Sequence, residues 1–475
     1  MILMREESEP QANTPCPNCK RLEREVQGLK AQVAVLTDQI KHLTALLEEA
    51  RRASKRQAAP FSKGDPKSDP RPPGRKPGDR YGLVAHRPPP PRIDEIVDIP
   101  APPVCESCGG EVEDVSIEKQ FLTDIPPVQP KTTLFHVHLG RCRRCGRRAQ
   151  GRHPRQISSA LGVAGNQIGP NAISIACCLN KRAGLSYGKI QQFFHTVFGL
   201  DHARATFVRA QIRLTGKSEP TYREMILQIR QSAAVYPDET GWRIGGHKAW
   251  LWAFTTLKVC VYAIRTGRGF EEARQILGAE FAGILGHDGW ESYNRFLQAL
   301  HQTCLAHLLR RCKELLETAT RGAARFPLAV KALLKQSLRL RDRFRSGTIS
   351  LRGVSLARGH LEARTNRLLS GSIRYPPNQT FARHLIRNRQ ALFTFLKHPG
   401  LEATNWPAEQ ALRPAVVNRK MSGGGNRTSR GAHAQEVLMS LLHTCHLQNL
   451  NPLSFMKQIL YSSQPTSFAA CFDST

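Results

Sequence analysis

A heptad repeat near the N-terminus constrains the fold of this chain more than any other feature. Two series recur every seven residues, offset by four: Leu22, Leu29, Leu36 and Leu43, and Val26, Val33, Ile40 and Leu47. Leucine at d with mostly β-branched residues at a favours a parallel two-stranded coiled coil. The competing interpretation, a single amphipathic helix packed on its own chain, usually has a broader apolar stripe. We therefore predict a coiled coil over residues 21–50 and a homodimer or higher oligomer.

The next segment, residues 51–103, loses this periodicity and is rich in Pro, Lys and Arg. Such a composition cannot bury a core, so a linker is expected. Arg75 and Lys76 within it could contact a phosphate backbone, but a merely solvated basic linker explains them equally well. The whole chain carries 69 Lys+Arg against 38 Asp+Glu, a net charge of +31. This excess favours a polyanionic partner, with DNA or RNA first among them.

Two features point to the cytoplasm, with nucleoid association. No apolar run approaches the length of a membrane span, and the N-terminus lacks the basic start and apolar core of a secretion signal. Thiols stay reduced in that compartment. The 13 cysteines are then better explained as metal ligands and buried residues than as disulfides.

Two dicysteine pairs define a small module over residues 104–155. The pairs are Cys105 with Cys108 and Cys142 with Cys145, each followed by glycine. Two such turns can complete a tetrahedral structural Zn²⁺ site. His136 and His138 are alternative ligands, or alternate positions on an exposed strand. A third pair, Cys16 and Cys19 in the segment 1–20, could form a shared four-thiolate site across a parallel dimer, or could be unused at a frayed terminus.

The remaining chain predicts a multidomain α+β protein. Residues 156–232 have helical apolar spacing and form the expected helical DNA-binding segment. From 233 the pattern changes to three short strands, with turns at Gly245-Gly246 and near Leu257, followed by the helix FEEARQIL, the strand AGILGHD and the helix SYNRFLQAL. This order suggests a mixed sheet with flanking helices. Residues 305–398 are mostly helical and rich in arginine. A helix, a Gly-rich loop and a last helix from Gln435 to Leu447 follow, with a tail over 451–475.

Two acidic positions in this basic chain follow β runs. Asp238-Glu239 closes one predicted strand and Asp288 closes another. Adjacent strand residues face opposite ways, so only one of Asp238 and Glu239 can enter a shared site. Carboxylates at the ends of neighbouring strands can hold Mg²⁺ or Mn²⁺, and a metal pair can activate a hydroxyl for attack on a phosphodiester. Turn formation explains each Asp separately, so the pattern alone leaves both interpretations open.

Three longer blocks resemble the insertion sequence 66 family of transposases (the TnpC type). They are DETGWR with KAWLWAF, HDGWESYNRF with HQTCLAHLLRRCKEL, and TNWPAEQALRPAVVNRK with MSGGGNRTSRGA. The order of zipper, linker and dicysteine module also matches that family. The resemblance implies a DDE transposase with a ribonuclease-H-like catalytic domain over 233–450 and a helical insertion at about 310–398. It implies Asp238, Asp288 and Glu409 as catalytic and metal-binding residues. Two departures are Trp406, where the family usually has a second Asn before the glutamate, and Gln410, where it usually has Arg.

The implied activity is DNA strand cleavage and strand transfer at the ends of a bacterial insertion sequence. The expected partners are element ends, target DNA and companion proteins of the element. Basic residues around the glutamate block are the expected phosphate contacts: Arg413, Arg419, Lys420, Arg427 and Arg430. His307, one helical turn after Cys304, either meets the scissile phosphate or only packs. Two alternatives stay open: an inactive DNA-binding protein that occupies terminal repeats, and a nuclease that never joins strands.

Overall fold

A computed structural model describes residues 17–55, 89–113, 116–319, 321–421, 424–462 and 466–468. The chain divides into two units, Met1–Leu83 and Val84–Thr475. Three predicted site residues, Cys16, Arg75 and Lys76, lie outside the described residues. Among the described helices, none has both the length and the apolar character needed to cross a membrane.

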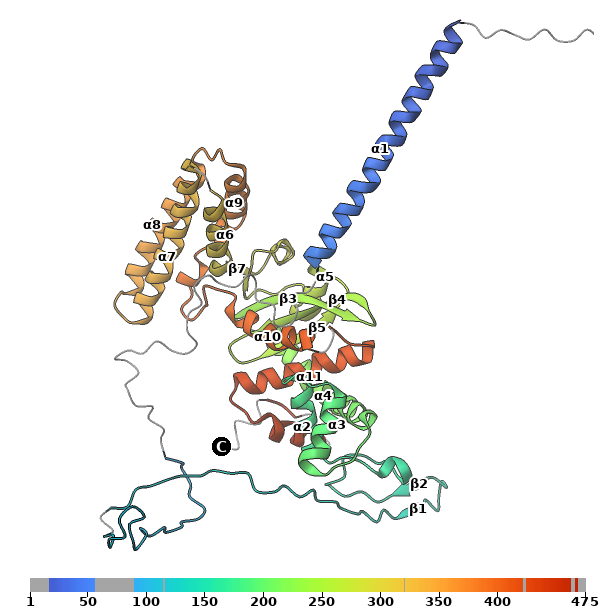
Figure 1. The fold of residues 1–475 in the computed structure, drawn as a ribbon, viewed down its shortest axis with the longest axis vertical. Helices are drawn as coiled ribbons and strands as arrows, with labels where there is room; N and C mark the ends of the chain where they lie inside the picture. Colours follow the sequence, from blue (N-terminus) through green and yellow to red (C-terminus); the bar gives the residue numbers. More distant parts are fainter. Residues whose placement is uncertain are drawn as a thin grey trace, which may run out of the picture. The chain divides into compact units, whose positions relative to one another are not determined.

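The first unit contains one long helix, α1 (Pro17–Lys55; Figure 1). The predicted helix over 21–49 is confirmed and extends further at both ends, with a proline at its first position, where no backbone N–H is needed. The heptad residues from Leu22 to Leu43 are exposed on this helix, with Leu29 60% and Ile40 64% accessible. The apolar stripe is thus unburied within one chain, and its pairing in a coiled coil stays a prediction.

The second unit starts with the dicysteine segment. It contains little regular structure: β1 (Leu139–Arg141) pairs antiparallel with β2 (Arg148–Gln150). The strand considered for His136 and His138 forms only from Leu139 onward, so neither histidine is part of it. Three helices follow: α2 (Pro170–Lys181), α3 (Tyr187–Phe198) and α4 (Arg204–Arg230). The predicted helical character of residues 156–232 is therefore confirmed over most of its length.

The centre of the second unit is a five-stranded mixed sheet in the order β5-β4-β3-β6-β7. Its first three strands, β3 (Ala234–Ile244), β4 (His247–Thr255) and β5 (Cys260–Arg265), are antiparallel neighbours. The predicted turn between β3 and β4 is confirmed: Gly245 and Gly246 both have positive φ, which glycine adopts without strain. After α5 (Phe270–Leu277), β6 (Ile284–His287) pairs parallel with β3, and β7 (Leu300–Thr303) pairs parallel with β6.

Two local predictions are wrong. The segment SYNRFLQAL is not one helix: it contains a short 3₁₀ helix (Glu291–Arg295) and then the start of β7. Backbone pairing with β6 is a tertiary contact that outweighs the local helical pattern. Asp238 also does not close a strand, because β3 continues to Ile244 and pairs with β4 along the whole hairpin. Asp288 does follow directly after β6, as expected.

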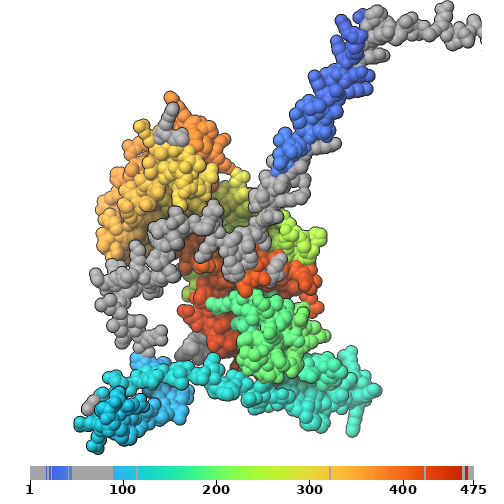
Figure 2. All heavy atoms as spheres, viewed as in Figure 1, coloured from blue at the N-terminus to red at the C-terminus, as the bar shows by residue number. Residues whose placement is uncertain are grey.

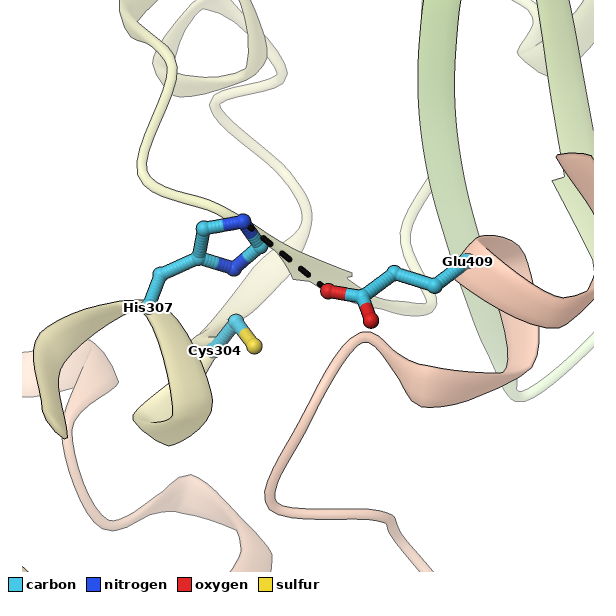
Figure 3. A group of neighbouring side chains, drawn as sticks. All are labelled: Cys304, His307 and Glu409. Atoms are coloured by element: carbon cyan, nitrogen blue, oxygen red, sulfur yellow. Dashed lines mark ion pairs between the residues drawn. The ribbon is translucent and has the colours of Figure 1, made fainter. Parts of the chain in front are cut away.

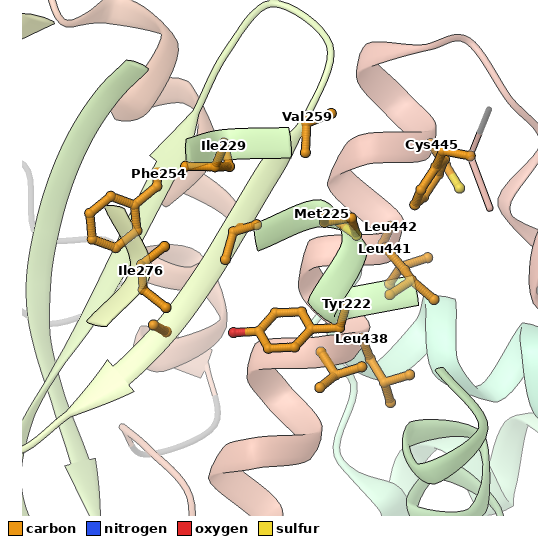
Figure 4. Close-up of a cluster of buried hydrophobic side chains, with 14 of the residues drawn as sticks. Tyr222, Met225, Ile229, Phe254, Val259, Ile276, Leu438, Leu441, Leu442 and Cys445 are labelled. Carbon is orange, nitrogen blue, oxygen red and sulfur yellow. The ribbon is translucent and has the colours of Figure 1, made fainter. Parts of the chain in front are cut away.

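Different helices cover the two faces of the sheet. One face buries Trp252 and Phe254 against α4 and α11 (Ser429–Leu447); Figure 4 shows Tyr222 and Met225 of α4 beside Leu438 and its neighbours on α11. On the other face, Leu251 and Ala253 belong to a cluster with Ala411 and Leu412 of α10 (Trp406–Met421). A side chain of β3 can therefore approach α10 only if it projects from the same face of the sheet as Leu251 and Ala253.

The predicted helical stretch 305–398 is confirmed. It contains α6 (Leu305–Thr318), α7 (Arg325–Arg345), α8 (Leu351–Ser370) and α9 (Pro376–Arg387), which share a second apolar core. These helices form the yellow and orange lobe of Figure 2. The last predicted helix starts at Ser429 rather than Gln435, because Thr428 caps it by accepting a bond from the Gly431 N–H at 3.1 Å. The expected tail contains a further helix, α12 (Pro452–Tyr461), which packs on α2 and α4.

Candidate active site

The register of two parallel strands brings Asp238 and Asp288 together. Ala234 pairs with Ile284 and Val235 with Leu285, an offset of 50 residues in each case (284 − 234 = 50). Asp238 and Asp288 have the same offset (288 − 238 = 50), so the same register carried past the end of β6 puts them side by side. Gly286 makes this approach possible, since a Cβ there would lie 2.5 Å from the Tyr236 ring. The β3–β6 pair thus delivers two carboxylates to one edge of the sheet.

Asp238 lies on the face of the sheet that α10 covers. Its cross-strand neighbour on β4 is Ala253, which packs in the cluster with Ala411 of α10. Directly paired residues on antiparallel strands project from the same face. Glu409 stands in the first turn of α10. The side chain of Asp238 and the helix that carries Glu409 therefore share one side of the sheet.

Asn405 fixes the start of α10 against β3. Its side-chain NH2 group donates to the backbone carbonyl of Pro237, the residue before Asp238, at 3.0 Å. Its backbone carbonyl accepts from the Glu409 N–H at 3.1 Å. Its own N–H donates to the Cys304 sulfur at 3.1 Å. Asn405 is 1% exposed. One buried amide thus connects the strand of Asp238, the helix of Glu409 and the start of α6.

The electrostatics of Asp238 reflect a crowded acidic site. Burial, the main cause, raises the pKa of Asp238 to about 7, and the charges of Glu239, Asp288 and Glu409 raise it further. The Glu239 N–H donates to Asp238 Oδ1 at 2.9 Å and opposes this shift. A divalent cation would relieve the repulsion among these carboxylates, and carboxylate oxygens are the ligands that Mg²⁺ and Mn²⁺ prefer. The residue types present therefore fit such an ion. Among the described residues, however, the oxygens of Asp238, Asp288 and Glu409 are not all within metal-ligand distance of one another, so their shared site stays a prediction.

Cys304, His307 and Glu409 form a tight group beside this site (Figure 3). Their ligand atoms all lie within 4.8 Å of one another, and His307 Nε2 is 3.9 Å from Glu409 Oε1. His307 Nδ1 is buried without a hydrogen-bond partner. Cys304 is buried, which raises the pKa of its thiol, while backbone N–H groups of Asn405, His307 and Ala306 lower it. His307 therefore lies against the Glu409 carboxylate, and its contact with the scissile phosphate stays a prediction.

Glu239 has different surroundings from Asp238. It pairs with Trp252 on β4, whose side chain belongs to the opposite face. Its carboxylate lies 2.5 Å from Arg268 Nε and accepts from the Tyr293 hydroxyl at 2.9 Å. The Glu239 side chain is only 2% exposed. The alternation argument thus holds, but Glu239 is a buried, paired charge, and its replacement would disturb the fold.

The helical lobe contributes a residue that local sequence analysis does not reveal. His384 of α9 packs on the turn after Asp288: a Cβ at Gly289 would lie 2.8 Å from the His384 ring, and Gly289 has φ +94°. Asp288 and His384 also interact electrostatically. Nothing local could identify His384, which is 96 residues from Asp288 (384 − 288 = 96). Asn405 could have been noticed, because it is the first of the two asparagines that the resembling family usually has.

Each dicysteine pair forms a tight turn, but the sulfurs of the two turns do not come together at metal-ligand distance. The N–H groups of Gly109 and Gly146 donate to the carbonyls of Cys105 and Cys142, each at 2.8 Å. Backbone N–H groups within each turn lower the pKa of the first thiol. This geometry suits thiolate ligands. Among the described residues, however, the four sulfurs do not form a group at metal-ligand distance, so one shared Zn²⁺ site stays a prediction.

The predicted phosphate contacts divide into two kinds. Arg413, Lys420, Arg427 and Arg430 are exposed. Arg419 is instead directed at β3: its guanidinium donates to the Gly241 carbonyl and to Thr240 Oγ1, the latter at 3.2 Å. The Gly-rich loop also has an internal role, because a Cβ at Gly425 would lie 2.3 Å from the Arg243 carbonyl oxygen. That glycine permits the loop to dock on β3.

Comparison with known proteins identifies the class of this chain. Residues 165–434, more than half of the chain, match the Transposase IS66 family. The matched region contains Asp238, Asp288 and Glu409. The chain belongs to the IS66 family of transposases. It is also similar to an uncharacterized protein, y4qI, of Sinorhizobium fredii, with 23% identity over 423 residues, covering 82% of this chain and 75% of that protein.

Proposed function

We propose that this transposase cuts DNA at the ends of an insertion sequence and joins the freed ends to target DNA, using Asp238, Asp288 and Glu409 as a metal-binding triad. The observation that supports this proposal is the β3–β6 register, which, if continued past the end of β6, would place Asp288 beside Asp238 on the side that α10 covers. The order of three antiparallel strands followed by two parallel ones also supports a ribonuclease-H-like catalytic domain. The reaction would take place on nucleoid DNA in the cytoplasm.

The side chains have distinct tasks in this reaction. Asp238, Asp288 and Glu409 would hold two Mg²⁺ or Mn²⁺ ions, which when bound activate the attacking oxygen and stabilise the leaving oxygen of a phosphodiester. Water attacks first, at the end of the element, and the freed 3′-hydroxyl then attacks the target strand. Asn405 keeps the start of α10 against β3, so that the glutamate stays opposite the aspartates. His307 orients the Glu409 carboxylate from the first turn of α6.

Exposed basic side chains would position the DNA. Arg413, Lys420, Arg427 and Arg430 surround the glutamate helix and the loop after it, and phosphate contacts of this kind fix register without reading sequence. Arg419 would support that surface indirectly, through its bonds to β3. Arg75 and Lys76 would add contacts from the linker.

Assembly through α1 is a further part of the proposal. The described apolar residues of the α1 stripe are exposed and have the heptad spacing of a two-stranded coiled coil. A dimer would bring two active sites to the two ends of one element. Zn²⁺ at Cys105, Cys108, Cys142 and Cys145 would order the dicysteine segment, and a dimer could add a site at Cys16 and Cys19.

One assay separates this function from its alternatives. The full chain is incubated with labelled element ends and target DNA in Mg²⁺, and the products are resolved by size. Joined product supports the transposase reaction. Cut product without joining would assign a nuclease, and a stable complex with intact DNA would assign a protein that only occupies terminal repeats. Companion proteins of the element are added in a parallel arm.

A further inference from the structure

The helical lobe has a strongly unbalanced charge distribution. Between residues 325 and 370 there are eleven Lys and Arg, seven on α7 and four on α8, against two acidic residues, Asp342 and Glu362. A solvated helix normally mixes both signs. The α7–α8 pair therefore contributes +9 (11 − 2) to the net charge of +31.

The charges on α7 fall on one face. Lys331, Lys335, Arg339 and Arg343 are spaced i, i+4, i+8 and i+12, so they form a single stripe along the helix. The first is half-buried and the other three are exposed. On α8, Arg364 lies beside this stripe, because its guanidinium donates to Gln336 of α7 at 2.7 Å, and Arg367 is one turn further along the same face. We call these six residues the α7–α8 basic face.

Ordinary solvation does not account for this arrangement. Like charges at i, i+4 destabilise a helix, so the stripe costs stability in the free protein. In the neighbouring helix α6, acidic residues offset the basic ones: Arg311 pairs with Glu314 at 3.4 Å and Lys313 with Glu317 at 3.6 Å. Among the described residues, no member of the basic face has an ion-pair partner, while Arg341, Arg345 and Arg358 outside it each have one. Six of the eight Lys and Arg of α7 and α8 without an ion pair in the described part of the chain thus lie on this face, and the other two are Arg325 and Arg352.

We propose that the α7–α8 basic face binds the phosphate backbone of duplex DNA, as a second contact surface besides the one near the glutamate helix. The stripe spans about 18 Å, at roughly 1.5 Å per helical residue, a length of duplex axis over which one strand carries about five phosphates at ~3.4 Å of axial rise per step. The face consists of lysine and arginine alone. Such side chains suit contacts with the phosphate backbone, whereas base stacking usually needs aromatic side chains. The proposal rests on the DNA-directed role of the family and does not depend on the carboxylate chemistry.

The test compares two charge-matched variants of the full chain. The first is the triple variant Lys335→Gln, Arg339→Gln and Arg343→Gln. The control is Lys258→Gln, Arg274→Gln and Lys313→Gln, which removes three exposed positive charges from elsewhere on the same unit. Binding to a fluorescent duplex of arbitrary sequence is measured by anisotropy, in EDTA, between about 50 and 200 mM salt.

The face variant should bind about tenfold or more weakly than the control at 100 mM salt, and the slope of log K against log salt should shrink by about 0.9 per lost phosphate contact. Its melting temperature should equal or exceed that of the wild type, since i, i+4 repulsion is removed. Equal slopes for the two variants would overturn the proposal, as would tighter binding of a duplex RNA of the same length. Because no metal is present, a failed cutting assay leaves this result unaffected.

Discussion

At the residue scale, the proposed site includes Asp238, whose ionised form is unfavourable in the folded, metal-free protein. Asp238 has an ordinary pKa of 3.8, and burial among other carboxylates raises it to about 7. A carboxyl group with a raised folded-state pKa costs stability once it is ionised. Stability of the metal-free protein should therefore fall as pH rises from about 4 to about 7. The charge of Asp238 therefore does not stabilise the fold.

This cost gives the first prediction. Asp238→Asn keeps the shape and removes the charge, so it should stabilise the metal-free protein by about 2–4 kcal/mol at pH 8, given ~1.4 kcal/mol per pKa unit. Thermal unfolding in EDTA from pH 4 to 8 measures this effect. The advantage of the variant should vanish near pH 4 and shrink when Mg²⁺ is added to both proteins. A variant less stable than the wild type at pH 8 would show that the Asp238 charge is already compensated in the fold.

How much of this site could be predicted differs from residue to residue. The strand alternation and the resembling blocks were enough to separate Asp238 from Glu239. They could not reveal that Glu239 is buried against Arg268, nor that His384 packs at Asp288, because both contacts join residues far apart in sequence. Arg419 was expected at a phosphate for its charge alone, and the hydrogen bonds that direct it to β3 had no local signal.

At the element scale, strongly periodic segments were predicted well and pairing-dependent ones poorly. The α1 helix and the Gly245-Gly246 hairpin have unambiguous local patterns, and both are confirmed. The strand β7 has only four residues and depends on β6 for its hydrogen bonds, so the sequence does not predict it, and the predicted helix SYNRFLQAL includes its first residue, Leu300. The last helix was predicted too short because the Thr428 cap lies within a Gly-rich loop.

The α1 helix carries the second prediction. Leu29→Pro or Leu36→Pro should break the helix by removing a backbone hydrogen bond, and it should remove a core contact of the coiled coil. Sedimentation velocity should then show a monomer where the wild type is a dimer. Leu46→Ala, outside the two heptad series, is the matched control and should stay dimeric. A proline variant that remains dimeric at low concentration would mean that the interface lies elsewhere.

The dicysteine turns carry the third prediction. Protein purified without chelator should contain one Zn²⁺ per chain, and Cys105→Ser or Cys142→Ser should lower that content. Cys312→Ser serves as the control, since this thiol is buried in the helical lobe. Elemental analysis provides the measurement. Zinc content that is unchanged by substitution in either turn would refute the shared site.

At the scale of the whole molecule, different parts of the second unit have different roles in the proposed reaction. The mixed sheet brings Asp238 and Asp288 together, α10 adds Glu409, and the helical lobe packs His384 against the same edge while exposing a basic face to solvent. The lobe is inserted in the chain between β7 and α10, so it can contact DNA without interrupting the sheet. The general plan of strands, insertion and glutamate helix followed from the sequence, but the contacts that join them did not.

The most direct test of this account is strand cutting and joining by the amide variants of the triad. Asp238→Asn, Asp288→Asn and Glu409→Gln should each abolish both steps in Mg²⁺ while binding of element ends stays within a few-fold of the wild type, because the metal pair supplies the chemistry and basic residues supply the affinity. Glu402→Gln is the control: this residue pairs with Arg345 at 3.0 Å, seven positions before Glu409, and its variant should remain active. Activity that survives in any triad variant, or that is lost in Glu402→Gln with Glu409→Gln unaffected, would contradict the assignment.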